Sequence, residues 1–141
     1  MSLSFQATND LLISAKLTQR NMHPYYAHYG VDWQIETITA QIAHLENLDI
    51  VCDGSIIGII RLAFDDQGCY IRDFQIEEKY QNRGMGALAL AHCEIYAKQL
   101  GYQQLRLRVF QISPAIHLYE RCGFTRDKAE DNFYYLSKQI G

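Results

Sequence analysis

The sequence has no long hydrophobic run. None of its apolar stretches approaches the ~20 residues that a membrane-spanning helix requires. Its first residues also lack the basic start and the apolar stretch of a secretory signal peptide. These absences argue against a membrane protein and predict a cytoplasmic one.

Cysteine and proline are scarce, with four cysteines and two prolines among 141 residues. Cys52, Cys69, Cys93 and Cys122 are widely and irregularly spaced, and no two of them form a C-x-x-C pair. Such spacing suggests neither a zinc site nor a disulfide framework. We therefore expect reduced thiols that pack as small apolar residues, and no metal.

A surplus of basic residues is also missing, because 13 Lys and Arg stand against 16 Asp and Glu, for a formal charge of -3. Non-specific nucleic-acid binding depends on clustered cations that contact phosphates. Here the basic residues are scattered, and Arg106 and Arg108 alternate with apolar residues as in a strand with one wet face. The sequence therefore predicts no nucleic-acid partner, and its slight negative charge weakly favours cationic substrates such as amines.

What the sequence does contain fits a single globular domain spanning residues 1–141. Hydrophobic residues make up 48% of the chain, and no repeat, low-complexity tract or linker interrupts it. From residue 49 onward strand-like runs follow one another, and Asp53-Gly54 between two of them is a strong hairpin signal. Strands, then a helix, then a strand and another helix predict an α+β fold with a sheet of mixed direction.

The N-terminal part is expected to be mostly helical. A strand at residues 3–8 precedes a helix that Asn9 or Asp10 caps. The segment 21–30, rich in His and Tyr, is expected to end that helix. Asp32 then has the features of a cap for a second helix.

Residues 81–86, Gln-Asn-Arg-Gly-Met-Gly, are the most informative stretch. They lie between a strand-like run at 70–76 and a helix-like run at 87–100. Gly84 and Gly86 have no Cβ, so the backbone can approach a ligand closely, and the first amides of the following helix lack intrahelical partners. A glycine-bearing turn that opens a helix is a candidate phosphate-binding site.

Other anion-binding loops fit this turn less well. A P-loop needs Lys followed by Ser or Thr after its second glycine, whereas Ala87 and Leu88 follow Gly86. The dinucleotide fingerprint could take Ala89 as its third small residue, but it belongs to the first strand-helix unit of a parallel sheet, and this turn comes past the middle of the chain. An ordinary tight turn stays open on these residues alone.

The helix after the turn is expected to pack one face on the sheet. That face carries Leu88, Ala91 and Ile95, widened by Ala87, Leu90 and Ala97. Further on, Ser113 is the predicted N-cap of a short helix with Pro114 at its first position, and Gly123 ends this helix. Residues 124–126 and 133–137 are the predicted closing strands.

A second segment narrows the choice for the glycine turn. Leu118-Tyr119-Glu120-Arg121-x-Gly123-Phe124 matches the Leu-Tyr-Glu-Lys/Arg-x-Gly-Phe signature of the GCN5-related N-acetyltransferase (GNAT) family. Gln81-x-x-Gly84-x-Gly86 matches that family's Arg/Gln-x-x-Gly-x-Gly/Ala loop for the acyl-CoA pyrophosphate. In order and spacing the chain resembles that family over about residues 50–137.

The resemblance implies a GNAT-like fold, in which about four helices flank a mixed, mostly antiparallel sheet. It implies that the fourth and fifth strands splay apart to admit the pantetheine arm of acetyl-CoA, the one cofactor expected. Backbone groups on the fourth strand would align the pantetheine and place an amide near the thioester carbonyl. The coenzyme-binding residues so implied are Phe74, Gln75, Ile76, Gln81, Asn82, Arg83, Gly84, Met85, Gly86, Ala87 and Ser113.

Tyr119 is the predicted general acid, because the family's matching tyrosine lies near the CoA sulfur. A phenol of pKa about 10 is protonated at neutral pH and able to donate its proton to a departing thiolate. The alternative is a core residue among apolar neighbours. One departure concerns Ser113, which stands where relatives carry an Asn that contacts CoA and which reaches less far.

No general base can be identified from the sequence. Many relatives carry Glu or His on the fourth strand or Glu on the fifth, but this chain has Tyr70, Arg72 and Arg108 at those positions. Asp73, Glu77 and the histidines stay open, and none is assigned. An amine that loses its proton to water before binding would need no dedicated base.

The acceptor pocket is expected between the first two helices. Tyr25, Tyr26 and Trp33, with neighbouring Tyr and His residues, could form its wall because aromatic faces attract cations. The alternative is a cluster that only packs one helix on the other.

The sequence thus predicts an acetyl-CoA-dependent N-acetyltransferase that acts on a primary amine of a small molecule or peptide by direct attack on the thioester. The alternative is a module that binds an acyl-CoA as a sensor without turnover. A homodimer is compatible with either function.

Overall fold

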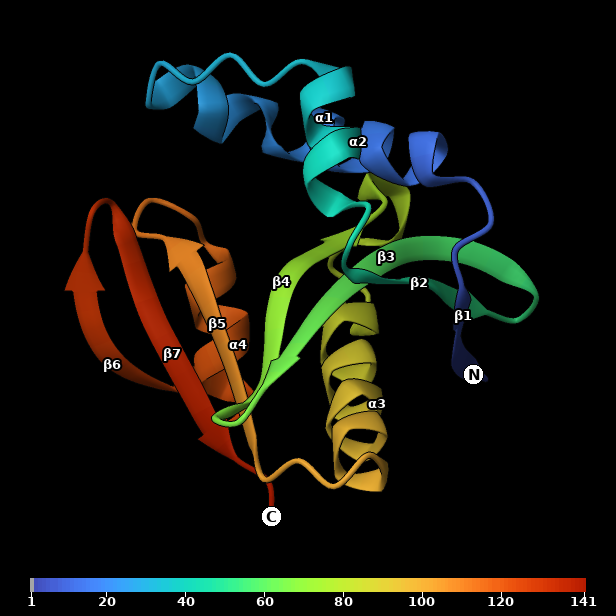
Figure 1. Cartoon of the computed structure of the whole chain (residues 1–141), viewed down its shortest axis with the longest axis vertical. Helices are drawn as coiled ribbons and strands as arrows, with labels where there is room; N and C mark the ends of the chain where they lie inside the picture. Colours follow the sequence, from blue (N-terminus) through green and yellow to red (C-terminus); the bar gives the residue numbers. More distant parts are fainter. Residues whose placement is uncertain (1) are drawn as a thin grey trace.

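The computed structural model describes residues 2–141, which form one seven-stranded sheet, four α-helices and a 3-10 turn (Figure 1). The strand order is β1-β2-β3-β4-β5-β7-β6, and every neighbouring pair is antiparallel except β4 and β5. The predicted fold, a mixed and mostly antiparallel sheet with about four helices, is confirmed. The elements are β1 (Leu3–Ala7), α1 (Leu11–His28), α2 (Ile35–Ile42), β2 (Glu46–Cys52), β3 (Ser55–Asp65), β4 (Gly68–Ile76), η1 (Glu78–Tyr80), α3 (Met85–Gln99), β5 (Gln104–Phe110), α4 (Ala115–Arg121), β6 (Thr125–Glu130) and β7 (Phe133–Gln139).

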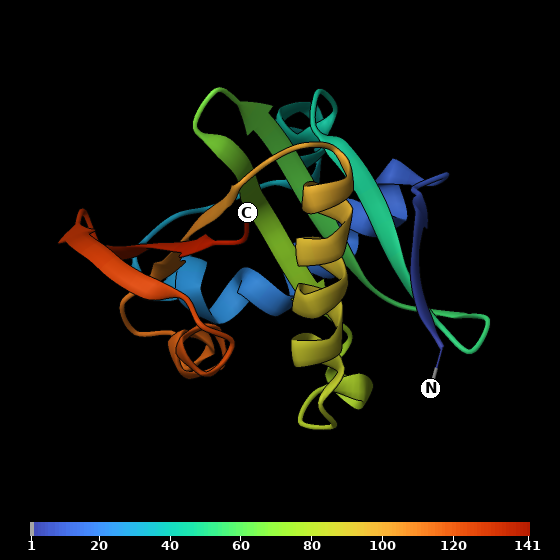
Figure 2. The same ribbon diagram turned by 90° about the horizontal axis from the view of Figure 1, so that it is seen from below.

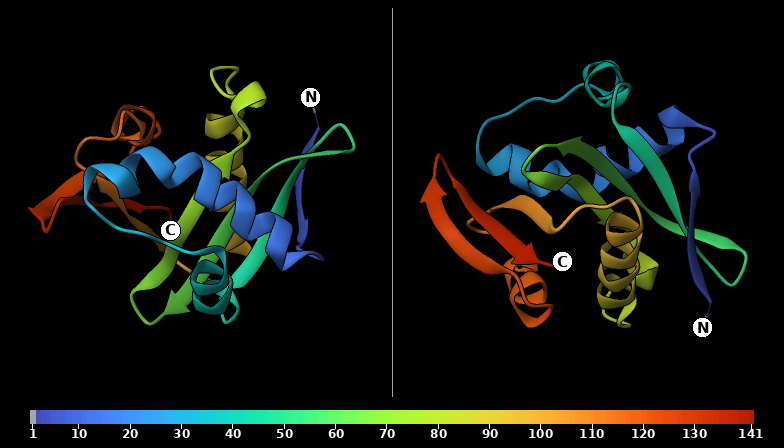
Figure 3. Two further views of the ribbon diagram at one scale, coloured as in Figure 1. Left: turned by 90° about the horizontal axis from the view of Figure 1, so that it is seen from above. Right: turned by 60° about the horizontal axis from the view of Figure 1, so that its bottom comes forward.

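Helices cover both faces of the sheet (Figure 2). The main core lies between the sheet and the helices α3 and α4, and it includes Ile60 and Leu107. On the opposite face a smaller cluster of Ala15, Ile38 and Ile42 joins α1 to α2. Seen from above, α1 crosses β3 and β4, and its C-terminal end lies toward β5 and β7 (Figure 3).

The first two helices depart from the prediction at their ends. The Asp10 carboxylate caps α1 as expected, accepting a helix N–H at 3.1 Å. The helix then continues through Pro24, so most of the His- and Tyr-rich segment is helical. The predicted Asp32 cap is wrong, because α2 begins after Gln34, whose side-chain amide donates to Asp32 instead. No helix within residues 2–141 is long and apolar enough to span a membrane.

The packing face of α3 also differs from the predicted one. Leu88 and Ile95 are 42% and 54% exposed, and Ala91 is exposed as well. The buried residues are Met85, Ala89, Leu90, Cys93 and Ala97. All but Leu90 recur every four residues, and the small side chains in this row let the helix lie close to the sheet. The prediction was wrong because it followed the larger aliphatic side chains, which here point outward.

Strands β4 and β5 pair only near their beginnings. Their parallel register joins residues 69–71 to residues 105–107, although both strands continue further. Just past this point the register of β4 against β3 shifts and leaves Arg72 without a partner, which is a β-bulge. A bulge bends and twists the strand that carries it. From there the two strands diverge (Figure 1), as the resemblance implied.

A buried arginine joins β3 to its surroundings. Arg61 has no exposed surface, and its guanidinium forms an ion pair with the Asp73 carboxylate on β4. It also donates to Thr18 Oγ1 at 2.7 Å, to Ser14 Oγ at 2.8 Å and to Asn47 Oδ1 at 2.9 Å. Burial lowers the pKa of Arg61, and the negative charge of Asp73 opposes that effect. One guanidinium therefore connects α1, β2, β3 and β4.

Replacing Asp73 by Asn should lower the free energy of unfolding by about 3 kcal/mol, because the Arg61 charge would stay buried without its counter-ion. Urea unfolding followed by circular dichroism measures the loss. Asp65→Asn is the matched control, since it removes a carboxylate that pairs with Arg106 but is 50% exposed, and its effect should be much smaller. Equal losses in the two variants would contradict the role assigned to the buried pair.

Candidate functional site

The start of α3 presents free backbone amides. Asn82 and Gly84 have φ angles of 59° and 79°, left-handed values that turn the loop into the helix. Gly84 is the N-cap residue, no side chain caps the helix, and its first turn holds no acidic residue. Leu88 makes the first intrahelical bond, from its N–H to the Gly84 carbonyl at 3.2 Å, so the amides of residues 85–87 have no helical partner. With the positive end of the helix dipole, they can bind an anion.

Glycine is needed at the two positions of this loop for different structural reasons. At Gly84 a Cβ would meet no heavy atom within 4 Å, so glycine is needed there for its positive φ. At Gly86 a Cβ would lie 2.8 Å from Leu118 Cδ2, so its absence lets α4 pack against the start of α3. The two motifs recognised in the sequence therefore contact each other directly.

Hydrogen bonds along β4 connect the buried ion pair to the glycine turn, residues 81–86, hereafter the glycine loop. Gln75 Nε2 donates to Asp73 Oδ1 at 2.8 Å, and Gln75 Oε1 accepts from Asn21 Nδ2 at 3.2 Å. The Ile76 carbonyl accepts from Asn21 Nδ2 and from Gln81 Nε2, both at 2.9 Å. Gln81, predicted to bind the coenzyme, is thus a residue that fixes the loop to the end of β4.

The end of β4 is held on one side and open on the other. Residues 73–76 pair with β3, and a Cβ at Gly58 of β3 would overlap the Gln75 carbonyl oxygen. Phe74 packs against the main core. On the β5 side, no strand partner follows Ile71 within residues 2–141. An extended ligand can therefore run along this free side of β4.

Tyr119 lies on α4 and is only 8% exposed. Its ring meets Phe124 edge-on, with the ring centroids 5.8 Å apart. Burial raises the pKa of its phenol above the ordinary value, and the negative charge of Asp73 adds to the effect. Tyr119 is therefore protonated at neutral pH and beyond it, and it can donate a proton. The residue is part of the core, which was the alternative interpretation, and this does not prevent it from acting as an acid.

Ser113 connects α4 to α1. Pro114, not Ser113, is the N-cap residue by backbone geometry, so the predicted positions are shifted by one. Ser113 Oγ nevertheless accepts from the Ala115 N–H at 3.2 Å, and it donates to Tyr25 Oη at 3.4 Å. Tyr25 in turn stacks on Phe110 at the end of β5, with the centroids 5.9 Å apart. A predicted coenzyme residue and a predicted acceptor residue are therefore in contact.

The aromatic cluster expected to wall the acceptor pocket divides into two groups. Tyr25 and Tyr29 stack on Phe110 of β5. Tyr26 instead lies against Trp33, with the centroids 6.1 Å apart, and Trp33 packs against the cluster between α1 and α2. Burial raises the pKa of Tyr26 to about 12, with Asp73 contributing. The second group thus joins the two helices, and only the first reaches β5.

The carboxylates considered as a base are paired or lie elsewhere. Asp73 pairs with Arg61 and accepts from Thr18 Oγ1 at 3.1 Å. Glu77 has no side-chain hydrogen bond or ion pair within residues 2–141, but it lies elsewhere, in a groove of about 510 Å³ between α1 and η1 to which Arg20 and Asn21 also contribute. None of the residues predicted to bind coenzyme or acceptor lines this groove.

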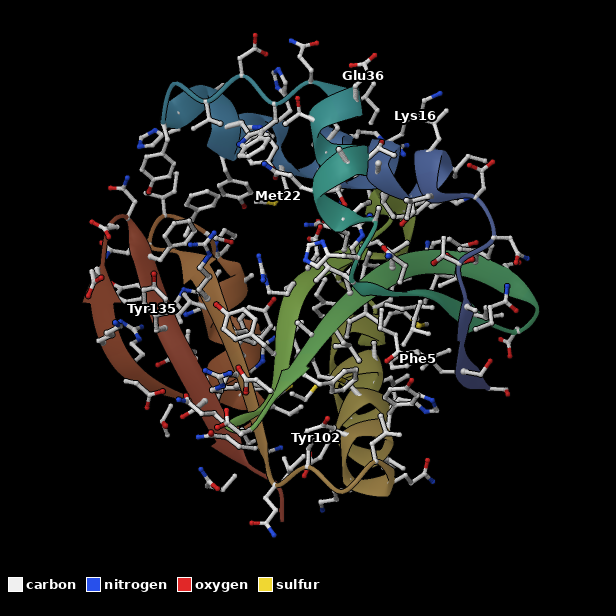
Figure 4. The ribbon with its side chains drawn as sticks, in the orientation of Figure 1. Phe5, Lys16, Met22, Glu36, Tyr102 and Tyr135 are labelled. Carbon is white, nitrogen blue, oxygen red and sulfur yellow. The ribbon has the colours of Figure 1, made fainter. Side chains whose placement is uncertain are left out.

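The sequence missed one set of residues on the sheet face below α1. They are Tyr70 and Arg72 of β4, Arg108 of β5, and Phe133 and Tyr135 of β7, of which Figure 4 labels Tyr135. The Arg72 guanidinium carbon lies 5.7 Å from the Tyr70 ring centroid, and that of Arg108 lies 4.1 Å from the Phe133 centroid. The alternation of Arg106 and Arg108 with apolar residues on β5 was the available sequence signal, but it indicated only that one face of the strand is exposed to solvent.

Comparison with known proteins agrees with this geometry. A streptothricin acetyltransferase from Streptomyces lavendulae is 29% identical over 75 residues, which are 51% of this chain and 40% of that protein. The match thus spans well under half of that relative's length.

Solved structures show the same fold over nearly the whole chain. The PaiA N-acetyltransferase from Thermoplasma acidophilum, in complex with coenzyme A, has a TM-score of 0.78 at 18% identity, with 99% of both chains covered. The ribosomal-protein-S18-alanine N-acetyltransferase from Escherichia coli has a TM-score of 0.74 at 16% identity, with 99% of this chain and 95% of that chain covered.

The sequence profile described as the Acetyltransferase (GNAT) family matches residues 9–124, which include the glycine loop and almost all of α1 through α4. The match covers most of the chain, and the diverging β4 and β5 have the form that the resemblance implied. The protein therefore belongs to the GNAT family of acetyltransferases.

Proposed function

We propose that this protein transfers the acetyl group of acetyl-CoA to a primary amine of a small molecule or peptide. The observation that carries the proposal is the uncapped start of α3 beside the free side of β4, with α4, the helix that carries Tyr119, packed against that start. The structural neighbour from Thermoplasma acidophilum, which is in complex with coenzyme A, supports coenzyme A as the carrier. We further propose that residues 1–141 act as one domain.

The chain's own groups fit such a ligand. Acetyl-CoA supplies an activated thioester. The amides of residues 85–87 would bind its diphosphate, since no acidic side chain competes in the first turn of α3. Backbone groups of residues 74–76 would align the pantetheine and direct an amide toward the thioester carbonyl, which can lower the barrier by about 3 kcal/mol. Tyr119 would donate its proton to the sulfur that leaves.

The amine must be neutral to attack. Asp73 is paired with Arg61, and Glu77 lies in a groove that no predicted coenzyme or acceptor residue lines. We propose that the acceptor gives its proton to water before or during binding. The relative from Streptomyces lavendulae is named for a small molecule, and the neighbour from Escherichia coli for a protein alanine, so both acceptor classes stay within the proposal.

The direct test combines binding with turnover. Calorimetry should detect binding of both CoA and acetyl-CoA, and free thiol should appear when acetyl-CoA is mixed with a panel of amines. Binding without any amine-dependent thiol release would favour a sensor. Absence of binding at high protein concentration would contradict the proposal altogether.

A carboxylate placed in the first turn of α3 should oppose coenzyme binding. We expect Ala87→Glu to weaken CoA binding at least tenfold by repelling the diphosphate, while leaving thermal stability equal or slightly higher because an acid favours a helix N-terminus. Ala91→Glu, one turn further along the same exposed side, is the matched control. Equal affinities in the two variants, measured by calorimetry, would argue against the diphosphate site.

Tyr119→Phe should reduce kcat on the order of 100-fold, because the leaving thiolate would lose its proton donor. The ring and its contact with Phe124 would be kept, so CoA affinity should change little. Thiol release under saturating acetyl-CoA gives kcat, and calorimetry gives the affinity. An unchanged kcat would reduce Tyr119 to a packing residue.

The pH dependence of the rate should also show whether Tyr119 is the acid. Tyr119 acts only when protonated, and burial raises its pKa, so the acid stays available as pH rises through and beyond neutrality. The rate should therefore increase with pH as more amine becomes neutral, with no fall below pH about 10, the ordinary pKa of a phenol. A falling limb centred well below that pH would be incompatible with Tyr119 as the acid.

A further inference from the structure

Two arginines, one on each strand, lie at the point where β4 and β5 part. The parallel register pairs residues 69–71 with residues 105–107, and Arg72 and Arg108 are the next residues of the two strands. Both side chains are exposed, and no ion pair involving either one is found within residues 2–141. Like charges at neighbouring positions of a sheet repel each other. An anion between them would relieve that repulsion.

Aromatic rings surround the two guanidinium groups. Arg72 lies against Tyr70, Arg108 lies against Phe133, and Tyr135 is opposite Arg108 in the register of β5 with β7. Burial raises the pKa of Tyr70, whereas the positive charges of Arg108, Arg72 and Arg106 lower it. Arg106 also lies over the Tyr70 ring, at 5.3 Å from its centroid. Met22 projects from α1 toward this face (Figure 4). The arginines are therefore set in a partly apolar surface that α1 overhangs.

The neighbouring arginine is different. Arg106, two residues before Arg108 on β5, forms an ion pair with Asp65. The distance between Arg106 Nη2 and Asp65 Oδ2 is 2.5 Å. The chain thus provides a counter-ion for one arginine of β5 and none for the pair at the opening. A chain with a formal charge of -3 nevertheless has a local excess of positive charge there.

We infer that the acceptor carries a carboxylate next to its amine, as an amino acid does, and that Arg72 and Arg108 bind this carboxylate. The inference rests on the proposed function and names the substrate class of that same site. A guanidinium matches a carboxylate with two parallel hydrogen bonds, which makes arginine suited to this recognition. Arg72 precedes Phe74 by two residues, or about 7 Å along a strand, so an amine near the thioester and a carboxylate at Arg72 belong to one small molecule.

The inference changes the expected character of the acceptor site. The overall charge and the aromatic cluster of α1 indicated only a cationic amine. The two arginines instead favour a molecule whose carboxylate offsets the positive charge around it, with an apolar side chain that can lie on Tyr70 or Tyr135.

The turnover test compares L-phenylalanine with L-phenylalaninamide and phenethylamine, which share the ring and the amine but lack the carboxylate. The wild-type protein should show a kcat/KM for the amino acid at least tenfold above those for the other two. The test is stringent because the amide has the lower amine pKa, so protonation alone favours it near neutral pH. A preference for either analogue without the carboxylate would overturn the inference.

Substitutions should locate the preference. Arg72→Gln and Arg108→Gln should each reduce the ratio of amino acid to amide roughly tenfold, as expected for the loss of one charged hydrogen-bonding partner. Arg20→Gln is the matched control, because it removes the same charge from the groove beside η1. CoA affinity should be unchanged in all three variants. A similar change of ratio in the control would mean that general electrostatics, not the pair, decides the preference.

A binding readout keeps the inference testable apart from turnover. In the presence of CoA, the product N-acetyl-L-phenylalanine should bind at least tenfold more tightly than its amide, and the two arginine variants should remove that difference. Equal binding of acid and amide would overturn the inference. Thiol release with all amines, but without any effect of the arginine variants, would overturn it while leaving acetyl transfer intact. Failure to bind CoA would instead contradict the proposed function itself.

Discussion

The ion pair between Arg61 and Asp73 sets the geometry on which the site depends. A charge buried without a partner is strongly unfavourable, so the guanidinium and the carboxylate must stay together. Because Arg61 also donates to residues of α1 and β2, the pair fixes the helix above the sheet at one position. From Asp73 the contacts continue through Gln75 and Asn21 to the Ile76 carbonyl, which also accepts from Gln81 of the glycine loop. A single buried charge thus aligns the strand end, the loop and the helix over them.

The opening between β4 and β5 results from a small number of local features acting together. The bulge at Arg72 turns β4 away just where its pairing with β5 stops. On the other side, Gly58 lets β3 follow β4 closely, so the bend does not separate those two strands. Contact between Gly86 and Leu118 then brings α4, with its tyrosine, against the start of α3. The glycine loop, Tyr119 and the free edge of β4 are therefore parts of one packed arrangement.

The parts of this arrangement that depend on short stretches of chain could be predicted from the sequence. The glycine turn, the Asp10 cap and the Asp53-Gly54 hairpin each follow from a few adjacent residues. What depends on two distant segments could not. Arg61 has the pattern of an ordinary strand residue until its register with Asp73 and the position of α1 are known.

The same limit applies to the candidate site. Helix α3 packs on the sheet mainly through small residues, and their contribution to packing depends on the sheet beneath them. The larger aliphatic residues Leu88 and Ile95 gave the stronger sequence signal, although they are exposed. Ser113 and Tyr25 meet although 88 positions separate them. Where β4 and β5 part, the sheet has two distinct faces: α3 and α4 cover one, and α1 covers the other. Under the proposed function, donor and acceptor can then occupy the protein at the same time, and the kinetics are those of a ternary complex without an acetylated enzyme.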